Sequence, residues 1–397
     1  MKISKKVAAV QGSVTLAIDA KAKAMRAAGE DVIGFGAGEP DFDTPSHIRA
    51  AAVAAMEAGK TRYTPAAGEL ALQQAICAKL LRDNGLQYEP NQIVVSNGAK
   101  HSLFNIFQAL LDEGDEVIVP SPCWVSYPEL IRMAGGVPVF VKGEKSNKYK
   151  VGAAEIERAV SPKTKAILIN SPNNPNGFVY SKEELSGIAA LLPKRDLYAI
   201  SDEIYEYLVY GGAEHLSIAS LSGEAKARTI VVNGVSKAYA MTGWRIGYTA
   251  SPVELAKAMT NFQSHSTSNP NSIAQHAAIA ALNGPTDELK SMVAEFARRR
   301  DRIVALIRGI EGLGCVEPEG AFYVMVDISA LFGKKLGQKA IEGSMSFTEL
   351  LLSEEKVAVV PGDGFLEDDC VRLSYAVSMG SIEEGLKRID RFVKKLH

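Results

Sequence analysis

Cysteine and histidine are scarce in the chain, and neither is arranged to hold a metal. The four cysteines among 397 residues have no metal-ligand spacing and suggest no disulfide framework, and the six histidines form no HxxH or HxxxH pair. We therefore expect no protein-bound metal, and the cysteine usage fits a reducing compartment.

Long hydrophobic runs and an excess of one charge are also absent. No stretch approaches about 18 apolar residues in a row, and polar residues interrupt the basic N-terminus, so we expect neither a bilayer-spanning helix nor a signal peptide. The 44 basic and 46 acidic side chains nearly balance, which gives no reason to expect a nucleic acid or a membrane as a partner. The cytoplasm is the expected location, with an organelle as the alternative if a transit peptide has been removed.

The sequence does contain a regular alternation of β-branched runs and amphipathic stretches. The runs are QIVVS (92–96), DEVIVP (115–120), VPVFV (137–141), KAILIN (165–170), LYAIS (197–201), TIVVN (229–233) and IGYTA (246–250). Near-continuous apolar strands separated by helices indicate a mainly parallel sheet with both faces covered. The sequence therefore predicts a three-layer α/β sandwich.

The chain length and a change of pattern near residue 288 predict two domains. A long charged helix over 288–312 leads into the shorter strands and helices of a smaller α+β domain. We expect the large domain to span 46–287 and the small domain to combine 1–45 with 288–397.

Chemically useful side chains follow the predicted strands, at the sheet edge where such folds bind ligands. A glycine turn that opens a helix, as at Gly98, presents the free N–H groups that a phosphate site needs. Taken alone, each feature also fits an ordinary turn, a packed aromatic ring or a surface ion pair. Together they place at one edge Gly98, Trp124, the asparagines of SPNNPNG (171–177), Asp202, Ser236, Lys237 and Arg245.

Two of these residues have specific chemical implications. A carboxylate at the end of a buried strand, as Asp202 would be, is costly unless it is paired, so a positive partner is implied. A lysine in a cleft, as Lys237 would be, often serves as a nucleophile. The whole set suits a flat, phosphorylated aldehyde cofactor with a protonatable ring.

Longer strings of the sequence point to a known family. These strings are GAGEPDFDTP (36–45), RYTPAAG (62–68), SPCWVSYPE (121–129), NSPNNPNG (170–177), SDEIYE (201–206), VSKAYAMTGWRIGY (235–248), PEGAFYV (318–324) and VRLSYA (371–376). With them the chain resembles the class I aminotransferases of fold type I, which depend on pyridoxal 5'-phosphate (PLP). The likeness is greatest to the bacterial-type aspartate aminotransferases, a subgroup that includes glutamate/aspartate–prephenate aminotransferases. Asn176 departs from the family's NNPTG string.

The resemblance implies PLP as the cofactor and suggests which residues hold it. Lys237 resembles the Schiff-base lysine that also shuttles the substrate's proton, Asp202 resembles the partner of the pyridinium nitrogen, and Trp124 resembles the residue stacked on the ring. The donors to the ring's phenolic oxygen would be Asn174 and Tyr205. The phosphate would be bound by Gly98, Ala99, Ser236 and Arg245, with Lys100 in the same turn.

The resemblance also implies the substrates. Arg372 resembles the clamp on the substrate's α-carboxylate, and Gly38 would add a backbone contact, with Trp124 and Asn174 beside them. The residues expected at the substrate's distal carboxylate are Lys100, Thr15 and Ser13. An acidic donor, aspartate or glutamate, is therefore favoured, with 2-oxoglutarate or oxaloacetate as the acceptor.

A partner subunit is implied as well. Tyr63 resembles the tyrosine that reaches the phosphate of the neighbouring subunit. The resemblance thus predicts a homodimer with shared active sites.

Other functions compete with this interpretation. A glutamate/aspartate–prephenate aminotransferase, or a PLP-dependent lyase of the same fold, would use much the same residues, because a fold does not determine its chemistry. A nucleotide-dependent oxidoreductase is disfavoured, because GFGAG (34–38) lacks the GxGxxG spacing and is not followed by a helix pattern.

Overall fold

A seven-stranded sheet lies at the centre of the computed structural model, which describes residues 2–10, 12 and 14–397. The strand order is β2-β8-β7-β6-β5-β3-β4. The strands are β2 (Ile93–Ser96), β3 (Glu116–Ser121), β4 (Val137–Lys142), β5 (Thr164–Asn170), β6 (Tyr198–Asp202), β7 (Thr229–Gly234) and β8 (Gly247–Ala250). All neighbours in this sheet pair in parallel except for β8, which is antiparallel to both β7 and β2. The predicted mainly parallel sheet is confirmed.

Helices cover both faces of this sheet. The helices are α3 (Ser46–Glu57), α4 (Leu70–Asn84), α5 (Ala99–Leu110), α6 (Ser126–Met133), α7 (Ala153–Ala159), α8 (Lys182–Lys194), α9 (Gly223–Ala227), α10 (Val253–Ser266) and α11 (Ser272–Asn283). Alternate strand residues enter separate cores, as side chains on a strand must. Val119 and Leu168 pack with α5, α6 and α10, whereas Ile118 and Ile167 pack with α7 and α8. Burial on both faces explains the near-continuous apolar runs and confirms the three-layer arrangement.

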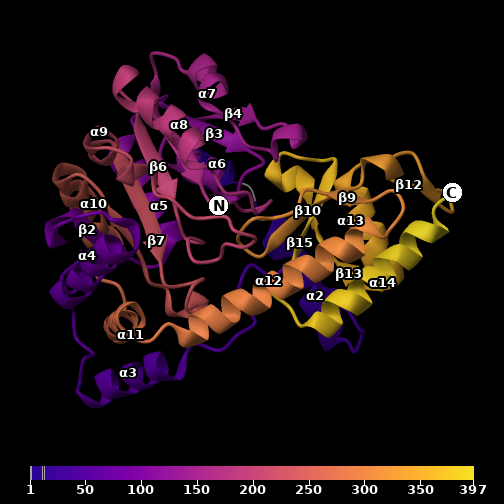
Figure 1. The fold of residues 1–397 in the computed structure, drawn as a ribbon, viewed down its shortest axis with the longest axis horizontal. Coiled ribbons are helices and arrows are strands. Elements are labelled where there is room, and N and C mark those ends of the chain that lie inside the picture. The colour runs from indigo at the N-terminus through magenta and orange to yellow at the C-terminus, as the bar shows by residue number, and fades with distance from the viewer. Residues whose placement is uncertain (1, 11, 13) are drawn as a thin grey trace.

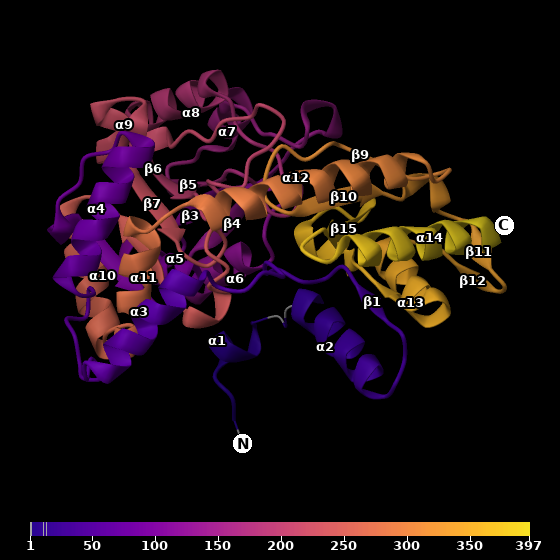
Figure 2. The same ribbon diagram turned by 60° about the horizontal axis from the view of Figure 1, so that its bottom comes forward.

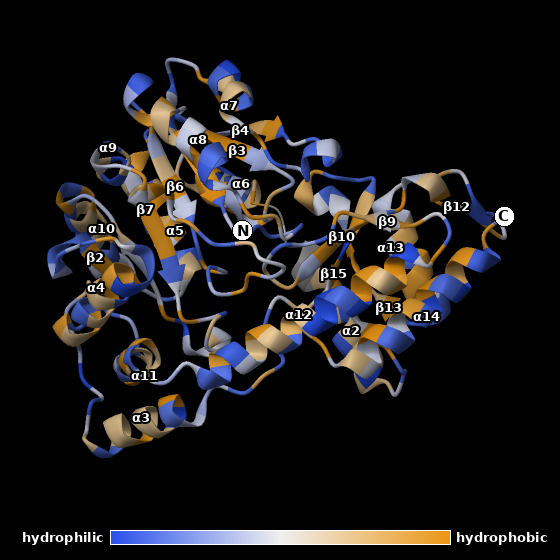
Figure 3. Ribbon diagram, viewed as in Figure 1, coloured by the Kyte–Doolittle hydropathy of each residue, from blue (hydrophilic) through white to orange (hydrophobic). Residues whose placement is uncertain are grey.

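The C-terminal part forms a smaller body beside the sheet (Figures 1 and 2). Its helices are α12 (Asp287–Arg308), α13 (Ser344–Glu355) and α14 (Met379–Lys395). Its strands are β9 (Gly314–Cys315), β10 (Tyr323–Asp327), β11 (Lys335–Leu336), β12 (Lys339–Ala340), β13 (Val357–Ala358), β14 (Val360–Pro361) and β15 (Cys370–Ser374). Four of them form a sheet in the order β14-β15-β10-β9. Hydrophobic and hydrophilic residues alternate along α12 and α14, as expected of helices with one face in a core (Figure 3).

The N-terminal segment joins this smaller body. It contains α1 (Lys5–Ala8), α2 (Val14–Ala27) and β1 (Ile33–Gly34), and β1 pairs in parallel with β13. The division at residues 46 and 287 stays a prediction, because α12 runs without a break from beside the large sheet into the smaller body (Figure 1). Among the described residues, no helix combines the length and the apolar character needed to cross a membrane.

The reversed direction of β8 decides which side chains share an edge of the sheet. The first residue of β8, Gly247, pairs with the last residue of β7, Gly234, and with the last residue of β2, Ser96. The beginning of β8 therefore lies at the same edge as the carboxyl ends of its neighbours. A Cβ on Gly247 would lie 2.2 Å from the backbone nitrogen of Ala99, so only glycine allows β8 to approach the start of α5 this closely.

Candidate active site

A cavity of about 620 Å³ lies at this sheet edge and is closed on another side by the N-terminal segment and β15. The residues predicted from the sequence that line it are Gly38, Ala99, Lys100, Trp124, Asn174, Asp202, Tyr205, Ser236, Lys237, Arg245 and Arg372. The structure therefore brings together residues that are up to 334 positions apart, from Gly38 to Arg372.

Asp202 ends β6 and is buried in the cavity wall. The hydroxyl of Tyr127 donates to its Oδ2 at 2.7 Å, and the backbone N–H of Ile204 donates to its Oδ1 at 3.3 Å. Burial raises the pKa of the Asp202 carboxyl to about 6, although both hydrogen bonds act in the opposite direction. A cation placed against Asp202 would stabilise its charged form, which suits the protonated nitrogen of a ring.

Lys237 follows β7 and reaches across the cavity. Its Nζ donates to the carbonyl oxygen of Gly38 at 2.5 Å. Burial lowers the pKa of the Lys237 amine to about 8, with Glu39 opposing the shift and Arg245 adding to it. A larger share of the amine is therefore neutral, and hence nucleophilic, near neutral pH than for an ordinary lysine.

The start of α5 and the turn before β8 form a corner suited to an anion. Gly98 has a φ of +86°, and α5 begins at the next residue. The Arg245 guanidinium donates to the carbonyl oxygens of Thr242 at 2.8 Å and Asn97 at 3.2 Å. A Cβ on Gly98 would lie 2.4 Å from Nη2 of Arg245, so the glycine keeps this corner open for the guanidinium. A helix N-terminus beside an arginine and Ser236 is a good phosphate site.

Arg372 is a buried cation on β15 without a carboxylate partner among the described residues. Its guanidinium donates to Oδ1 of Asn174 at 3.0 Å and to the carbonyl oxygen of Gly36 at 3.1 Å. Its Nε has no hydrogen-bond partner in the described part of the chain. The guanidinium also lies 4.3 Å from the ring centroid of Tyr323. A buried charge that meets only neutral groups favours an anionic ligand.

Aromatic side chains form the remaining walls. The rings of Trp124 and Tyr127 are 5.2 Å apart at 85°, and Nζ of Lys100 lies 4.9 Å from the Trp124 ring centroid. Burial lowers the pKa of Lys100, and the charge of Arg245 adds to this effect. The hydroxyls of Tyr205 and Tyr323 are 3.0 Å apart. The cavity thus offers flat apolar surfaces with polar groups at their edges.

Several lining residues had not been predicted. Asn170 donates to the carbonyl oxygen of Asp202 at 3.0 Å, and its Oδ1 accepts from the backbone of Asn174 at 2.8 Å. Tyr127 lies in the string SPCWVSYPE but had no assigned role. Asn170 ends the predicted strand 165–170, and this position was the signal that could have identified it. Tyr127 lies in α6, seven residues after the predicted strand 115–120, where only its place in the family string gave a signal. The other unpredicted lining residues include Lys23, Arg26, Glu39, Thr242 and Tyr323.

Two predicted site residues, Gly98 and Tyr63, do not line this cavity, and two others fall outside the described part of the chain. Gly98 lies just behind Arg245. The Tyr63 side chain is 92% exposed and does not line the cavity. Ser13 and the side chain of Thr15 lie outside the described residues.

A family model described as aminotransferase class I and II matches residues 30–389. The chain belongs to this family. An aspartate aminotransferase of Bacillus subtilis (strain 168) is 51% identical over 395 residues, covering 100% of both chains. A probable aspartate/prephenate aminotransferase of Aquifex aeolicus (strain VF5) is 49% identical over 396 residues, covering 99% of each. The structure of an aspartate aminotransferase from Thermus thermophilus with maleate has a TM-score of 0.93 at 44% identity, covering 98% of this chain and 99% of that one.

This aminotransferase depends on PLP, as its family does. The residues of the cavity fit the cofactor. The glycine at position 98 leaves room for the Arg245 guanidinium beside the start of α5, and the Lys237 amine faces the same cavity. Asp202 is buried, and no cation among the described residues forms a hydrogen bond with its carboxylate. The phosphate of PLP would meet Arg245, its ring nitrogen would meet Asp202, and its aldehyde would meet the amine of Lys237.

The lowered pKa of Lys237 leads to a test of the apoprotein. The rate at which PLP is incorporated should rise with pH and level off above about 8, because only the neutral amine attacks an aldehyde. The rate is measured from the absorption of bound cofactor between pH 6 and pH 10. Nα-acetyl-lysine is the control, and its rate should keep rising toward about pH 10. Parallel profiles for the protein and the control would contradict the assignment.

Proposed function

We propose that this aminotransferase moves the amino group of aspartate or glutamate to a 2-oxo acid, 2-oxoglutarate or oxaloacetate. The observation that carries the proposal is the buried guanidinium of Arg372, which meets neutral oxygens and has an unpartnered Nε in the described chain, in the same cavity as Lys237 and Asp202. An α-carboxylate would supply the missing anion. The name of the Bacillus subtilis relative supports the same assignment.

Each residue has a distinct part in this proposal. Bound PLP would act as an electron sink for the bonds at the substrate's Cα. Asp202, oriented by Tyr127, would keep a proton on the ring nitrogen, since an adjacent carboxylate favours the cationic form. Lys237 would anchor the cofactor and, once released by the incoming amine, carry a proton away from Cα. Such acid–base help is worth about 10²–10⁴-fold in rate.

The remaining residues would hold the reactants. The planar guanidinium of Arg372 can bind both oxygens of a carboxylate, which orients the bonds at Cα in a way that an ammonium group cannot. Trp124 would stack on the ring. The ring's phenolic oxygen would accept from Asn174 and Tyr205, and the phosphate would be bound by Gly98, Ala99, Ser236 and Arg245, with Lys100 in the same turn.

The distal carboxylate of the substrate would be bound by Lys100, together with Thr15 and Ser13. Lys100 lies in the cavity wall, in the first turn of α5, and its ammonium group lies over the ring of Trp124. A dicarboxylate other than aspartate can use the same cation. Transamination of prephenate is therefore the second candidate, and the name of the Aquifex aeolicus relative favours it.

A homodimer with shared active sites and a cytoplasmic location complete the proposal. The 92% exposure of Tyr63 supports a role for this side chain outside its own subunit. All four cysteines are free thiols, which suits the reducing cytoplasm.

The role of Lys237 can be tested by substitution. The variant Lys237→Ala should still bind PLP but lose turnover by orders of magnitude, because it lacks both the anchor and the proton carrier. Borohydride should fix the cofactor to the wild-type protein, at Lys237 by peptide mass spectrometry, and should leave Lys237→Ala unlabelled. Full transamination by the variant would refute the assignment.

The role of Lys100 can be tested through substrate selectivity. The variant Lys100→Ala should lose about 1–3 kcal/mol of binding for aspartate and for prephenate, because their distal carboxylate loses its cation. Activity toward alanine should change little. The measurement is kcat/KM for each donor, with the exposed Lys257→Ala as the control for the loss of a lysine elsewhere. Equal losses for alanine and aspartate would count against the role.

The shared site can be tested with mixed dimers. We expect both Tyr63→Ala and Lys237→Ala homodimers to be weakly active or inactive. A dimer with one chain of each kind should regain activity, because one of its sites combines an intact Lys237 with an intact Tyr63 from the other chain. Activity is measured after the two variants are unfolded, mixed and refolded together. A mixture no more active than its parts would contradict the shared site.

A further inference from the structure

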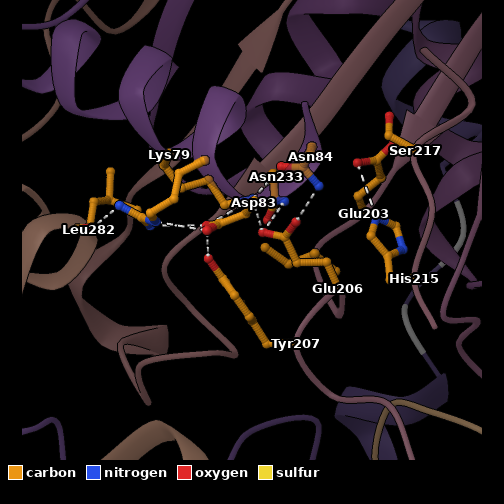
Figure 4. A network of polar contacts seen from close by, with 12 residues as sticks. Lys79, Asp83, Asn84, Glu203, Glu206, Tyr207, His215, Ser217, Asn233 and Leu282 are labelled. Atoms are coloured by element: carbon orange, nitrogen blue, oxygen red, sulfur yellow. Dashed lines mark hydrogen bonds and ion pairs between the residues drawn. The ribbon is translucent and has the colours of Figure 1, made fainter. Parts of the chain in front are cut away.

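The segment from Asp202 to Glu206 faces two environments in turn. Asp202 and Tyr205 line the cavity, whereas Glu203 and Glu206 are buried on the other side in a network of polar contacts (Figure 4). A backbone hydrogen bond of 2.9 Å from the N–H of Glu206 to the carbonyl oxygen of Glu203 tightens the turn between them. The contacts behind the turn therefore help to set where the cavity residues lie.

Glu206 is the point where this network joins separate parts of the chain. Its carboxylate accepts from Nζ of Lys79 at 2.5 Å, from Nδ2 of Asn84 at 3.0 Å and from Nδ2 of Asn233 at 2.9 Å. Figure 4 shows these three side chains converging on Glu206. Lys79 is on α4 and Asn84 is its last residue, whereas Asn233 belongs to β7. One carboxylate thus links a helix, a strand and the turn that carries Asp202.

The charges make this link stiff. The Lys79 side chain is fully buried, and its ammonium group contacts Glu206, the side-chain oxygen of Asn84 at 2.7 Å and, at 3.9 Å, the carboxylate of Asp83. A buried ion pair whose hydrogen bonds are satisfied resists displacement, because moving either partner leaves an uncompensated charge.

A metal ion is not the better interpretation of this cluster. Glu203, Glu206 and His215 offer ligand atoms within 4.8 Å of one another. The Glu203 carboxylate already accepts from the hydroxyls of Ser201 at 2.8 Å and Ser217 at 2.6 Å. The Glu206 carboxylate accepts from three donors, one of them a cation, which would repel a second positive charge.

Asn233 connects Glu206 to the residues expected to hold the cofactor. Its Oδ1 accepts from the backbone N–H of Gly234 at 2.7 Å, where β7 ends. Ser236 and Lys237, which line the cavity, follow two and three residues later. The path from Glu206 to Lys237 therefore consists of two hydrogen bonds and a short stretch of backbone.

We propose that Glu206 is a positioning residue for the cofactor site. Through Asn233 it holds the end of β7, and thus Lys237, in register with the turn that carries Asp202. The inference rests on the proposed function, since it assumes that Lys237 and Asp202 hold PLP.

Two asparagines provide a matched test. Asn233→Ala and Asn84→Ala each remove one side-chain amide that donates to Glu206, at 2.9 Å and 3.0 Å respectively. Each amide oxygen also accepts one hydrogen bond of 2.7 Å, from the N–H of Gly234 in the first case and from Nζ of Lys79 in the second. Only Asn233 lies on the strand that leads to Lys237. For each variant we would measure the dissociation constant of PLP from the apoprotein, the pH at which the absorption of bound cofactor changes, and the midpoint of urea unfolding.

Asn233→Ala should weaken PLP binding by about tenfold, as the loss of an outer partner of a site commonly does, and should shift the pH at which the absorption changes. Asn84→Ala should lower the unfolding midpoint while both cofactor readouts stay at the wild-type values. Equal effects of the two variants on PLP binding, or none in either, would overturn the inference. A wild-type protein that binds no PLP would instead overturn the proposed function and this inference together.

A second pair keeps the test valid if Asn233→Ala fails to fold. Glu206→Gln removes the central charge, and Glu355→Gln removes a comparably buried carboxylate that binds Arg391 and Lys395 between α13 and α14, away from the cavity. Glu206→Gln should change both cofactor readouts, and Glu355→Gln should change only the stability. If the two variants show the same dissociation constant for PLP and the same pH for the absorption change, the inference is also overturned.

Discussion

The burial of unpaired charge at one edge of the central sheet is the constraint on which the site depends. Asp202 meets a hydroxyl and a backbone N–H, and Arg372 meets an amide oxygen and a carbonyl oxygen. Both side chains are buried, and neither Asp202 nor Arg372 forms an ion pair with a described residue. Folding alone leaves these charges without opposite partners, which is costly. A ligand with a cationic ring at one end and a carboxylate at the other would satisfy both.

The topology of the sheet explains how so many groups reach one cavity. Parallel strands bring their carboxyl ends to the same edge, which places Asp202 after β6 and Lys237 after β7. The reversed strand β8 contributes from its beginning, so Arg245 reaches the same edge although it precedes its strand. The smaller body closes the space, because β15 carries Arg372 and the N-terminal segment carries Gly36 and Gly38.

Stability and function are joined in the turn after β6. Asp202 and Tyr205 are buried at the cavity, and the carboxylates of Glu203 and Glu206 accept hydrogen bonds from Ser217 and Lys79 behind them. Because Glu206 also contacts Asn233, the turn and the end of β7 cannot shift independently without breaking a buried hydrogen bond. Strain and unpaired charge at a site are commonly held in place by such surrounding contacts.

The strands, the helices between them and the class of fold were predictable because they follow from local pattern. Each predicted strand of the large sheet begins and ends within a residue or two of the observed one. Buried apolar runs and the turns between them can be recognised from residues that are neighbours in the sequence. The family strings likewise singled out Lys237, Asp202 and Arg372, which the structure brings to one cavity and whose roles stay predictions. The antiparallel direction of β8 was not predicted, because a run of apolar residues does not indicate whether its strand pairs in parallel or antiparallel with its neighbours.

By itself, the sequence determined the order of strands and helices, the family and the residues proposed to carry the chemistry, because these depend on residue types at short spacing. Only the tertiary structure decided which groups meet: Tyr127 with Asp202, Arg372 with Gly36, and Glu206 with Lys79 and Asn233. The first two contacts span 75 and 336 positions of the chain. Such contacts depend on how whole layers pack, and no local pattern encodes the distance between two side chains that only the complete fold brings together.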